Sequence, residues 1–463
     1  MSEEKAKITR RSYMKYVGGV VAVAVVAAAG YGIYEATKPT PTPMYTVNIC
    51  TWFGAGLFTA LIKEGVKQPL LLEFEKDKNV TVALADFTED VVREKSLLDA
   101  TSHTGTYDLW QSGGEIVAQY AVPKYLYPID DYMKNYTDPK YLDLSDVYPK
   151  ALEGLKYDGV SYGLPIYYTG PGITYRKDLF EEAGWDRPPN TMEELEEIAK
   201  ALTKPPNQYG LTTRCKAGEE PGIDVGGFAW AYGGTWFEGG AKTATEIKAN
   251  KAKPAFNTSE FLEGFKMFCD LSRKYGPPDT PNYTWYEQAE AYKSGLAAMV
   301  LPGNWCYWYL VQSATDETIK KNTRFAVPPP GPVRETQNFW SASLFMNADS
   351  KNKRAAWEVQ QLCAGKKMQE TMAASGNTAV TIRSLHRSGP LTELYPKEDL
   401  ANIEKAMDIA DWAYRPYFPE FPEVEILLGN ATSAVVAGRD AKTALDEVQD
   451  KAYSLMKAHG YYD

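Results

Sequence analysis

Apolar and polar positions alternate with two different periods along the first part of the chain. Tyr45–Trp52 and Val80–Ala85 are short runs rich in β-branched residues, which predict buried strands. Val66–Lys78 and Glu89–Ala100 carry apolar residues at helical spacing, and Thr106–Trp110 predicts a third strand. Strands that alternate with helices in this way predict an α/β fold with a mostly parallel sheet covered on both faces.

Later segments carry clearer helix signals. Thr191 with Glu194 three residues on predicts a capping box. The helix that follows is expected to bury one face, made of Met192, Leu195, Ile198, Ala199 and Leu202. Leu296–Leu301 is an apolar run that predicts a buried strand. A last amphipathic helix is expected near the C-terminus, with Ala444, Leu445, Val448, Ala452, Leu455 and Met456 on one face.

The N-terminus has the pattern of an export signal. Residues 1–15 are polar and basic and contain Arg10-Arg11, which resembles the twin-arginine motif. Residues 16–34 follow without one charge and are long enough for either a cleaved signal or a membrane anchor. Residues 35–44 include alternating Thr and Pro, typical of an extended spacer. The folded body is therefore expected to start near Tyr45, outside the cytoplasm.

Charge and composition exclude several classes of protein. The net charge of the chain is −10, and residues 1–44 hold six basic and three acidic side chains, so the body is more acidic still. An acidic body argues against nucleic acid and against an anionic membrane surface as partners. Three His and five Cys are too sparse and too widely spaced for a local metal motif or a disulfide framework. We therefore expect no metal and no cofactor.

One motif resembles a catalytic one. Gly159–Gly163 matches the G-x-S-x-G pattern of a hydrolase nucleophile elbow, which needs a strand-to-helix turn at the serine. Pro165 and β-forming residues follow instead of a helix, and only His386 and His459 lie downstream as candidate bases. No catalytic residue is therefore expected, although paired carboxylates leave an extracellular glycosidase open.

From Asp158 onward the chain resembles the maltose-binding-like family 1 of extracellular solute-binding proteins, which serve ABC importers. The segments 158–165 (DGVSYGLP), 173–180 (ITYRKDLF) and 350–358 (SKNKRAAWE) resemble family segments and occur in the family's order. Residues 182–184 with 188–195, 230–234, and 292–299 followed by 303–305 resemble further family segments. The resemblance implies a type II fold, in which two lobes are joined by crossing segments and enclose a ligand cleft.

The resemblance also suggests where the lobes begin and end. Residues 45–165 plus 285–330 are expected to form the first lobe, and 166–284 plus 331–463 the second. Crossings are then expected near 164–168, 283–287 and 328–336. Gly163 and Pro165 suit such a crossing, because one bends the chain and the other fixes its φ angle.

Aromatic residues make up 13% of the chain, more than a core alone requires, and sugars present flat C–H faces that stack on aromatic rings. Ligands bind at strand ends in open α/β sheets, which directs attention to residues that follow the predicted strands. The candidate ligand-binding residues are Trp52, Phe53, Asp86, Trp110, Gln111, Tyr168, Asn304, Trp305, Trp308 and Trp340. By resemblance to the family, Trp305 is expected to stack on the sugar.

The expected function is that of a non-enzymatic, monomeric substrate-binding protein of an ABC transporter. It would capture a mono- or oligosaccharide at the outer face of the cytoplasmic membrane and deliver it to the permease subunits. Another small solute, such as a polyamine, a metal complex or a peptide, stays open as the ligand. A structural cell-surface protein would bind no sugar at all.

Overall fold

The computed structural model describes residues 45–52, 60–63, 65–303 and 306–462. The predicted signal, anchor and spacer over 1–44 lie outside the described residues, as do the candidate site residues Phe53, Asn304 and Trp305. Within the described ranges, no helix is both long and apolar enough to cross a membrane.

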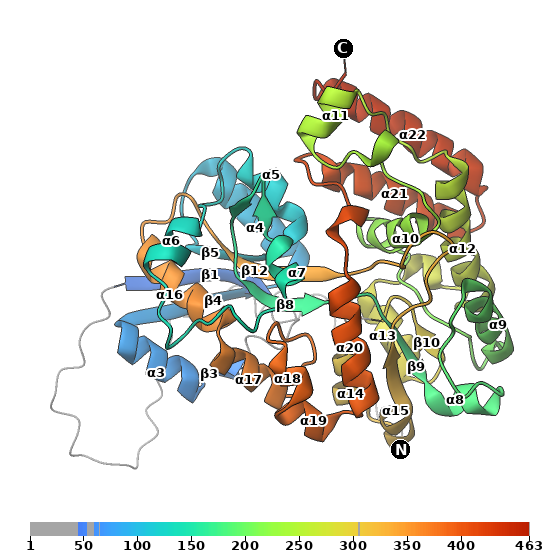
Figure 1. The fold of residues 1–463 in the computed structure, drawn as a ribbon, viewed down its shortest axis with the longest axis horizontal. Helices are drawn as coiled ribbons and strands as arrows, with labels where there is room; N and C mark the ends of the chain where they lie inside the picture. The colour runs from blue at the N-terminus through green and yellow to red at the C-terminus, as the bar shows by residue number, and fades with distance from the viewer. Residues whose placement is uncertain (1–44, 53–59, 64, 304–305, 463) are drawn as a thin grey trace, which may run out of the picture. The chain divides into compact units, whose positions relative to one another are not determined.

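A five-stranded sheet organises one region, which we call the large-sheet lobe (Figure 1). Its strand order is β4 (Val80–Phe87), β1 (Tyr45–Trp52), β5 (Leu109–Gly113), β12 (Trp340–Met346) and β8 (Pro165–Thr169). β1 runs parallel to β4 and β5, as predicted. β12 runs antiparallel to β5 and β8, so the sheet is mixed. The reason is that β12 enters from the other lobe and not through a strand–helix–strand crossover.

The alternation in β1 explains why both faces of this sheet are covered. Val47 and Ile49 belong to one apolar core, whereas Cys50 and Trp52 belong to another. Successive strand residues point to opposite faces, so a run of buried residues needs helices on both sides. The helices of this lobe are α3 (Pro69–Lys78), α4 (Glu89–Ser102), α5 (Val117–Ala121), α6 (Asp130–Asn135), α7 (Pro149–Glu153), α16 (Lys353–Ala364), α17 (Lys366–Ala374), α18 (Ser384–Arg387), α19 (Pro390–Leu394) and α20 (Lys397–Ile409). Short elements complete it: β2 (Ile62–Lys63), β3 (Val66–Lys67), η2 (Gly114–Ile116), β6 (Lys156–Tyr157) and β7 (Val160–Ser161).

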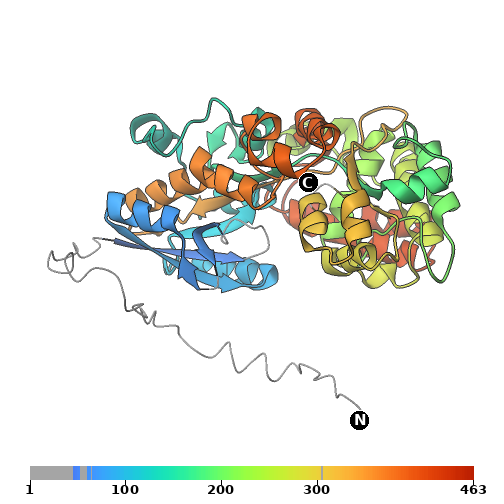
Figure 2. The ribbon, with the colours of Figure 1, turned by 90° about the horizontal axis from the view of Figure 1, so that it is seen from below.

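A three-stranded sheet organises the second region, the small-sheet lobe (Figures 1 and 2). Its order is β10 (Met299–Val300), β9 (Ile173–Arg176) and β11 (Thr323–Ala326), and both pairings are antiparallel. The surrounding helices are α8 (Lys177–Glu182), α9 (Met192–Leu202), α10 (Glu220–Ala231), α11 (Ala244–Asn250), α12 (Ser259–Tyr275), α13 (Trp285–Lys293), α14 (Tyr307–Ser313), α15 (Glu317–Asn322), α21 (Phe421–Val436) and α22 (Ala441–Ala458), with the short helices η3 (Glu238–Gly240) and η4 (Thr280–Asn282). The short helix η5 (Trp412–Tyr414) packs against the core of the large-sheet lobe.

The two predicted amphipathic helices form where expected. α9 buries Met192, Leu195, Ile198, Ala199 and Leu202, and α22 buries its apolar face except for Leu455, which is partly buried. The Thr191 hydroxyl accepts a hydrogen bond from Glu194 N, as a cap should. The Glu194 carboxylate does not complete the predicted box, because it accepts from Asn190 N and pairs with Arg187. The predicted strand over Leu296–Leu301 shortens to β10.

The strand pairings differ from the predicted lobe boundaries. β10 pairs with β9, so residues 299–300 lie in the small-sheet lobe, and β12 places 340–346 in the large-sheet lobe. The chain passes between the sheets at 170–172 and again at 327–339, close to two predicted crossings. No change of sheet occurs near 283–287. The third passage instead follows α20, since Ile403 and Met407 pack in the core of the large-sheet lobe and Phe418 in that of the small-sheet lobe.

Candidate functional site

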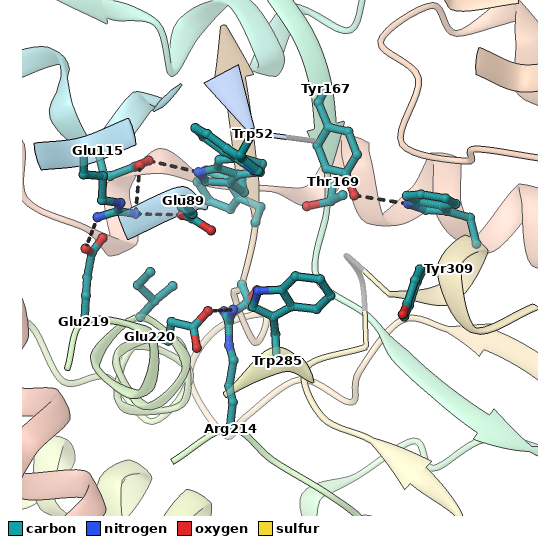
Figure 3. A pocket seen from close by; sticks show the side chains of 16 residues that line it. Trp52, Glu89, Glu115, Tyr167, Thr169, Arg214, Glu219, Glu220, Trp285 and Tyr309 are labelled. Carbon is teal, nitrogen blue, oxygen red and sulfur yellow. Dashed lines mark hydrogen bonds and ion pairs between the residues drawn. The ribbon is translucent and has the colours of Figure 1, made fainter. Parts of the chain in front are cut away.

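A pocket of about 130 Å³ receives side chains from both lobes (Figure 3). Its size is comparable with that of cavities that hold one small ring, about 150 Å³ in a case that binds benzene. The residues that line it are Trp52, Glu89, Arg93, Glu115, Tyr167, Thr169, Arg214, Glu219, Glu220, Ile223, Trp285, Trp308, Tyr309, Asn338, Phe339 and Trp340. Figure 3 shows the glutamates gathered toward one side and aromatic rings across the rest. We call these parts the acidic end (Glu89, Arg93, Glu115, Glu219 and Glu220) and the aromatic end (Trp52, Tyr167, Trp285, Trp308, Tyr309 and Trp340).

Strands of one sheet supply half of the aromatic end. Trp52 is the last residue of β1, and Trp340 is the first residue of β12, which runs the opposite way in the same sheet. Both therefore reach the same edge of the sheet, where their ring centroids lie 6.2 Å apart. Tyr167 of β8 packs edge-on against Trp340, at 5.6 Å between centroids. The aromatic wall thus lies at the end of the sheet where β1 finishes, which is the position of ligand sites in open α/β sheets.

Helices of the small-sheet lobe face that wall. Trp308 of α14 donates from Nε1 to the Tyr167 hydroxyl at 3.2 Å. Trp285 is the first residue of α13 and packs edge-on against Tyr309 at 6.0 Å. Tyr167 is buried, and burial raises its pKa well above the usual value, so the hydroxyl stays protonated. The aromatic end therefore offers flat apolar faces edged by neutral hydrogen-bonding groups.

Arg93 connects the two lobes at the acidic end. Its Nη2 lies 3.1 Å from Glu89 Oε1 and 3.6 Å from Glu115 Oε1, and its Nη1 pairs with Glu219 at the start of α10. Glu89, Arg93 and Glu115 belong to the large-sheet lobe, whereas Glu219 belongs to the small-sheet lobe. Burial raises the pKa of Glu115, while the charge of Arg93 contributes to lowering the pKa of Glu219 despite its burial.

Arg214 forms a second charged centre beside the first. Its Nε and Nη2 donate to the two oxygens of buried Asp224, each at 2.9 Å, and Nη1 donates to Glu220 at 3.2 Å. Asn338 Nδ2 also donates to Asp224, at 2.6 Å. Burial raises the pKa of Glu220 to about 7, against the opposing effect of Arg214. Trp340 links the two ends, because its Nε1 donates to Glu115 Oε2 at 3.0 Å.

Three of the candidate residues predicted from sequence line this pocket: Trp52, Trp308 and Trp340. Gln111 lies beside it. Its side-chain oxygen accepts hydrogen bonds from the Thr51 hydroxyl and from Trp52 N, so it supports the strand end that carries Trp52. Asp86 is exposed on β4 and does not line the pocket.

The prediction that Trp110 and Tyr168 contact the ligand is wrong. Trp110 is fully buried on β5, and its Nε1 donates to Asp99 Oδ2 at 3.2 Å. Tyr168 is also fully buried, and its hydroxyl donates to Met407 O at 3.0 Å. Both side chains point from the sheet into a core. Alternation along β8 makes Tyr167, the residue before Tyr168, the one that reaches the pocket.

No residue of the acidic end is among the candidates predicted from sequence. Glu89 and Arg93 lie one turn apart on α4, and Glu219 and Glu220 begin α10, where charged residues commonly face solvent. The only local sequence signal here was for a helix start, not for a site: Pro221 follows Glu220, and Pro favours the first turn of a helix. Trp285 and Tyr309 lay on segments that were not connected with the site.

The hydrolase resemblance finds no geometric support. Ser161 is buried on β7, and its backbone N–H donates to Asp130 Oδ2 at 2.9 Å. His386 lies in the core, with its ring nitrogens 3.1 Å from the Tyr148 hydroxyl and 2.8 Å from Thr378 O. Burial lowers its pKa to about 4, and neither ring nitrogen contacts Ser161.

A family model described as bacterial extracellular solute-binding protein matches residues 56–370, which is more than half of the chain. The mannitol-binding protein of Pseudomonas aeruginosa is 24% identical over 416 residues, covering 84% of this chain and 89% of that protein.

Solved structures of solute-binding proteins have a fold similar to that of this chain. A solute-binding protein of an ABC transporter from Agrobacterium radiobacter, in complex with ribitol, has a TM-score of 0.76 and 26% identity, covering 90% of this chain and all of that one. Another from Agrobacterium vitis, with bound D-mannitol, has a TM-score of 0.74 and 24% identity over the same shares of the two chains. The predicted two-lobe, type II architecture is confirmed by these similarities.

Proposed function

The chain belongs to the family of bacterial extracellular solute-binding proteins, and we propose that it captures a single monosaccharide or polyol and delivers it to the permease of an ABC importer. The family consists of substrate-binding proteins that act outside the cytoplasm. The proposal includes that the chain binds its ligand without changing it, and the support for this part is that the family is made up of substrate-binding proteins.

The observation that carries this proposal is the composition of the pocket. The six side chains of the aromatic end provide stacking surfaces for C–H faces, and Glu, Arg and Asn side chains offer acceptors and donors for hydroxyls. Trp52, Trp308 and Trp340, which were predicted from sequence, are proposed ligand contacts together with Tyr167 and Trp285. The relatives that carry ribitol and mannitol support a hydroxyl-rich ligand of this size.

The volume of the cavity favours one sugar unit over an oligosaccharide. About 130 Å³ suits a five- or six-carbon polyol or a single ring. We therefore narrow the predicted ligand class to small polyols and monosaccharides.

A thermal-shift screen followed by calorimetry tests this function. Purified full-length protein is titrated with ribitol, mannitol, tagatose, glucose and maltose, and the recovered ligand is examined by chromatography. We expect one of the small ligands to bind in the micromolar range or tighter and to be recovered unchanged, with maltose weaker. Ligand cleavage would refute the non-enzymatic part, and a maltose preference would refute the size argument.

We also propose export in the folded state by the twin-arginine route. The support is the pair Arg10-Arg11 ahead of the uncharged stretch 16–34. Replacing both arginines by lysine keeps the charge and is expected to leave the protein in the cytoplasm, whereas Lys5→Arg serves as a control. Export of the double variant at the parental level would exclude this route.

A further inference from the structure

The two ends of the pocket differ in charge as well as in shape. Figure 3 shows Glu89, Glu115, Glu219 and Glu220 on one side, and Tyr167, Trp285 and Tyr309 beyond them. A ligand that spans the pocket therefore meets carboxylates with one part and aromatic faces with another.

Carboxylates outnumber guanidiniums around the acidic end. Among the described residues that line the pocket or pair with its lining, five carboxylates accompany two arginines: Glu89, Glu115, Glu219, Glu220 and Asp224 with Arg93 and Arg214. Arg214 already has a buried partner, because it binds Asp224 through two hydrogen bonds. Among these arginines, only Arg93 then pairs with Glu89, Glu115 and Glu219.

Two carboxylate oxygens at this end lack a hydrogen-bond donor. Glu115 Oε1 and Glu219 Oε1 are buried and accept no hydrogen bond from any residue that the structure describes. Glu115 is 7% exposed, so bulk water does not satisfy that oxygen. A buried acceptor without a donor is costly, which makes each of these oxygens a position where a ligand's N–H or O–H group would be favourable.

We propose that the ligand of this pocket is a cationic sugar derivative, an amino sugar or amino polyol whose ammonium group binds at the acidic end while its C–H face lies on the aromatic end. This inference rests on the proposed function, because it assigns a charge to the same hydroxyl-rich ligand.

The physical reason is the cost of excess negative charge in a site that closes over its ligand. A neutral polyol offers hydrogen bonds but no positive charge, so it does not stabilise the ionised form of Glu115 and Glu220, whose pKa burial raises. An ammonium group brings three donors and no acceptor, and its charge offsets the excess. The adjacent indole and phenol rings attract a cation through their faces as well. The acidic end thus favours the ammonium, and the aromatic end favours the carbon skeleton.

A matched pair of ligands tests the proposal by calorimetry at pH 7 with the full-length chain. Mannitol and 1-amino-1-deoxy-D-mannitol have the same skeleton and differ at one terminal group. We expect the amino form to bind at least about tenfold more tightly, which corresponds to about 1.4 kcal/mol. Glu89→Gln and Glu220→Gln each remove a charge with little change in shape, and both are expected to reduce this preference. Glu370→Gln, on the exposed surface of α17, is the matched control and should retain it.

The possible outcomes separate this inference from the function beneath it. A preference for the amino form that falls in both site variants and persists in the control supports the inference. Equal or tighter binding of mannitol overturns the inference and leaves the proposed function in place. A preference that no site variant reduces also overturns it. If no polyol or monosaccharide of either kind binds, the proposed function itself fails.

Discussion

The acidic and the aromatic ends of the pocket are built from different parts of the fold. The aromatic end takes Trp52, Tyr167 and Trp340 from the edge of one sheet, where strand register fixes their positions. The other half of the aromatic end comes from α13 and α14 of the small-sheet lobe. The acidic end takes Glu89, Arg93 and Glu115 from α4 and η2 of the large-sheet lobe, and Glu219 and Glu220 from the start of α10 in the small-sheet lobe. The wall of Trp52, Tyr167 and Trp340 is therefore a property of one sheet, whereas the ion pair that joins the two parts of the acidic end exists only when both lobes are in place.

Among changes to the pocket lining, removing the charge that joins the lobes should have the largest effect on stability. Arg93→Met would leave Glu115 and Glu219 without their guanidinium, and both are largely buried. We expect the free energy of unfolding to fall by about 3 kcal/mol, the low end for breaking a buried ion pair, because 36% of the Arg93 side chain is exposed. Urea denaturation measures this loss.

A second variant tests whether the loss of stability comes from the carboxylate left without its partner. Arg93→Met combined with Glu219→Gln removes both partners of the bond between the lobes, and we expect it to recover part of the lost stability. An Arg93→Met protein as stable as the parent would show that the acidic end does not depend on this arginine.

Truncating the aromatic wall should weaken binding and leave the fold intact. Trp340→Ala is expected to reduce affinity by about tenfold to a few hundredfold, since aromatic side chains carry much of the energy at such sites. Trp110→Ala, on the adjacent strand β5, should instead cost about 3–5 kcal/mol of stability because Trp110 is fully buried. Calorimetry and thermal melting together distinguish the two tryptophans. Large destabilisation by Trp340→Ala with unchanged affinity would place Trp340 in the core.

Trp340→Phe sharpens the same comparison. It retains a ring but loses the Nε1 donor to Glu115. If stacking dominates, affinity stays within a few-fold of the parent. A loss as large as that of Trp340→Ala would show that the hydrogen bond between the two ends matters more than the ring.

A change of pH should affect the acidic end and not the aromatic one. Glu220 faces Arg214, Glu89, Asp224 and Glu219, and burial raises its pKa to about 7. The carboxyl is therefore mostly protonated at pH 6 and ionised at pH 8. Affinity for a cationic polyol should rise several-fold over this interval. The rise should stay below about tenfold, because the ionised fraction of Glu220 increases by about that factor between pH 6 and pH 8.

The control for this effect is Glu220→Gln, whose affinity should stay nearly constant from pH 6 to pH 8. The neutral polyol provides a second reference, since it gains nothing from the ionisation. Affinity for the cationic ligand that decreases as pH rises would contradict the assignment of Glu220 to its binding.

The smallest expected signal comes from the lobes themselves. Since the acidic end is shared between them, ligand should draw the lobes together about the passages at 170–172 and 327–339. Small-angle scattering at saturating ligand should show a small decrease in the radius of gyration. An identical radius with and without bound ligand would indicate a site that is already closed.

The aromatic end was partly predictable because its signals are local. Trp52 ends a strand that the β-branched run identifies, and Trp340 follows the Pro-rich passage that resembles a crossing. Trp110 and Tyr168 failed the same reasoning, because a strand end does not tell which face of the sheet a residue meets. One position along β8 separates buried Tyr168 from pocket-lining Tyr167.

The sequence by itself determined the family, the α/β class, the amphipathic helices α9 and α22 and the parallel pairing of β1 with its neighbours. These follow from periodicity, caps and motif order, which are properties of short segments. Only the tertiary structure decided that β12 joins the large sheet, that β10 joins the small one, and that Arg93 meets Glu219. Such contacts join residues more than a hundred positions apart, and they depend on how each lobe packs as a whole, which no local pattern encodes.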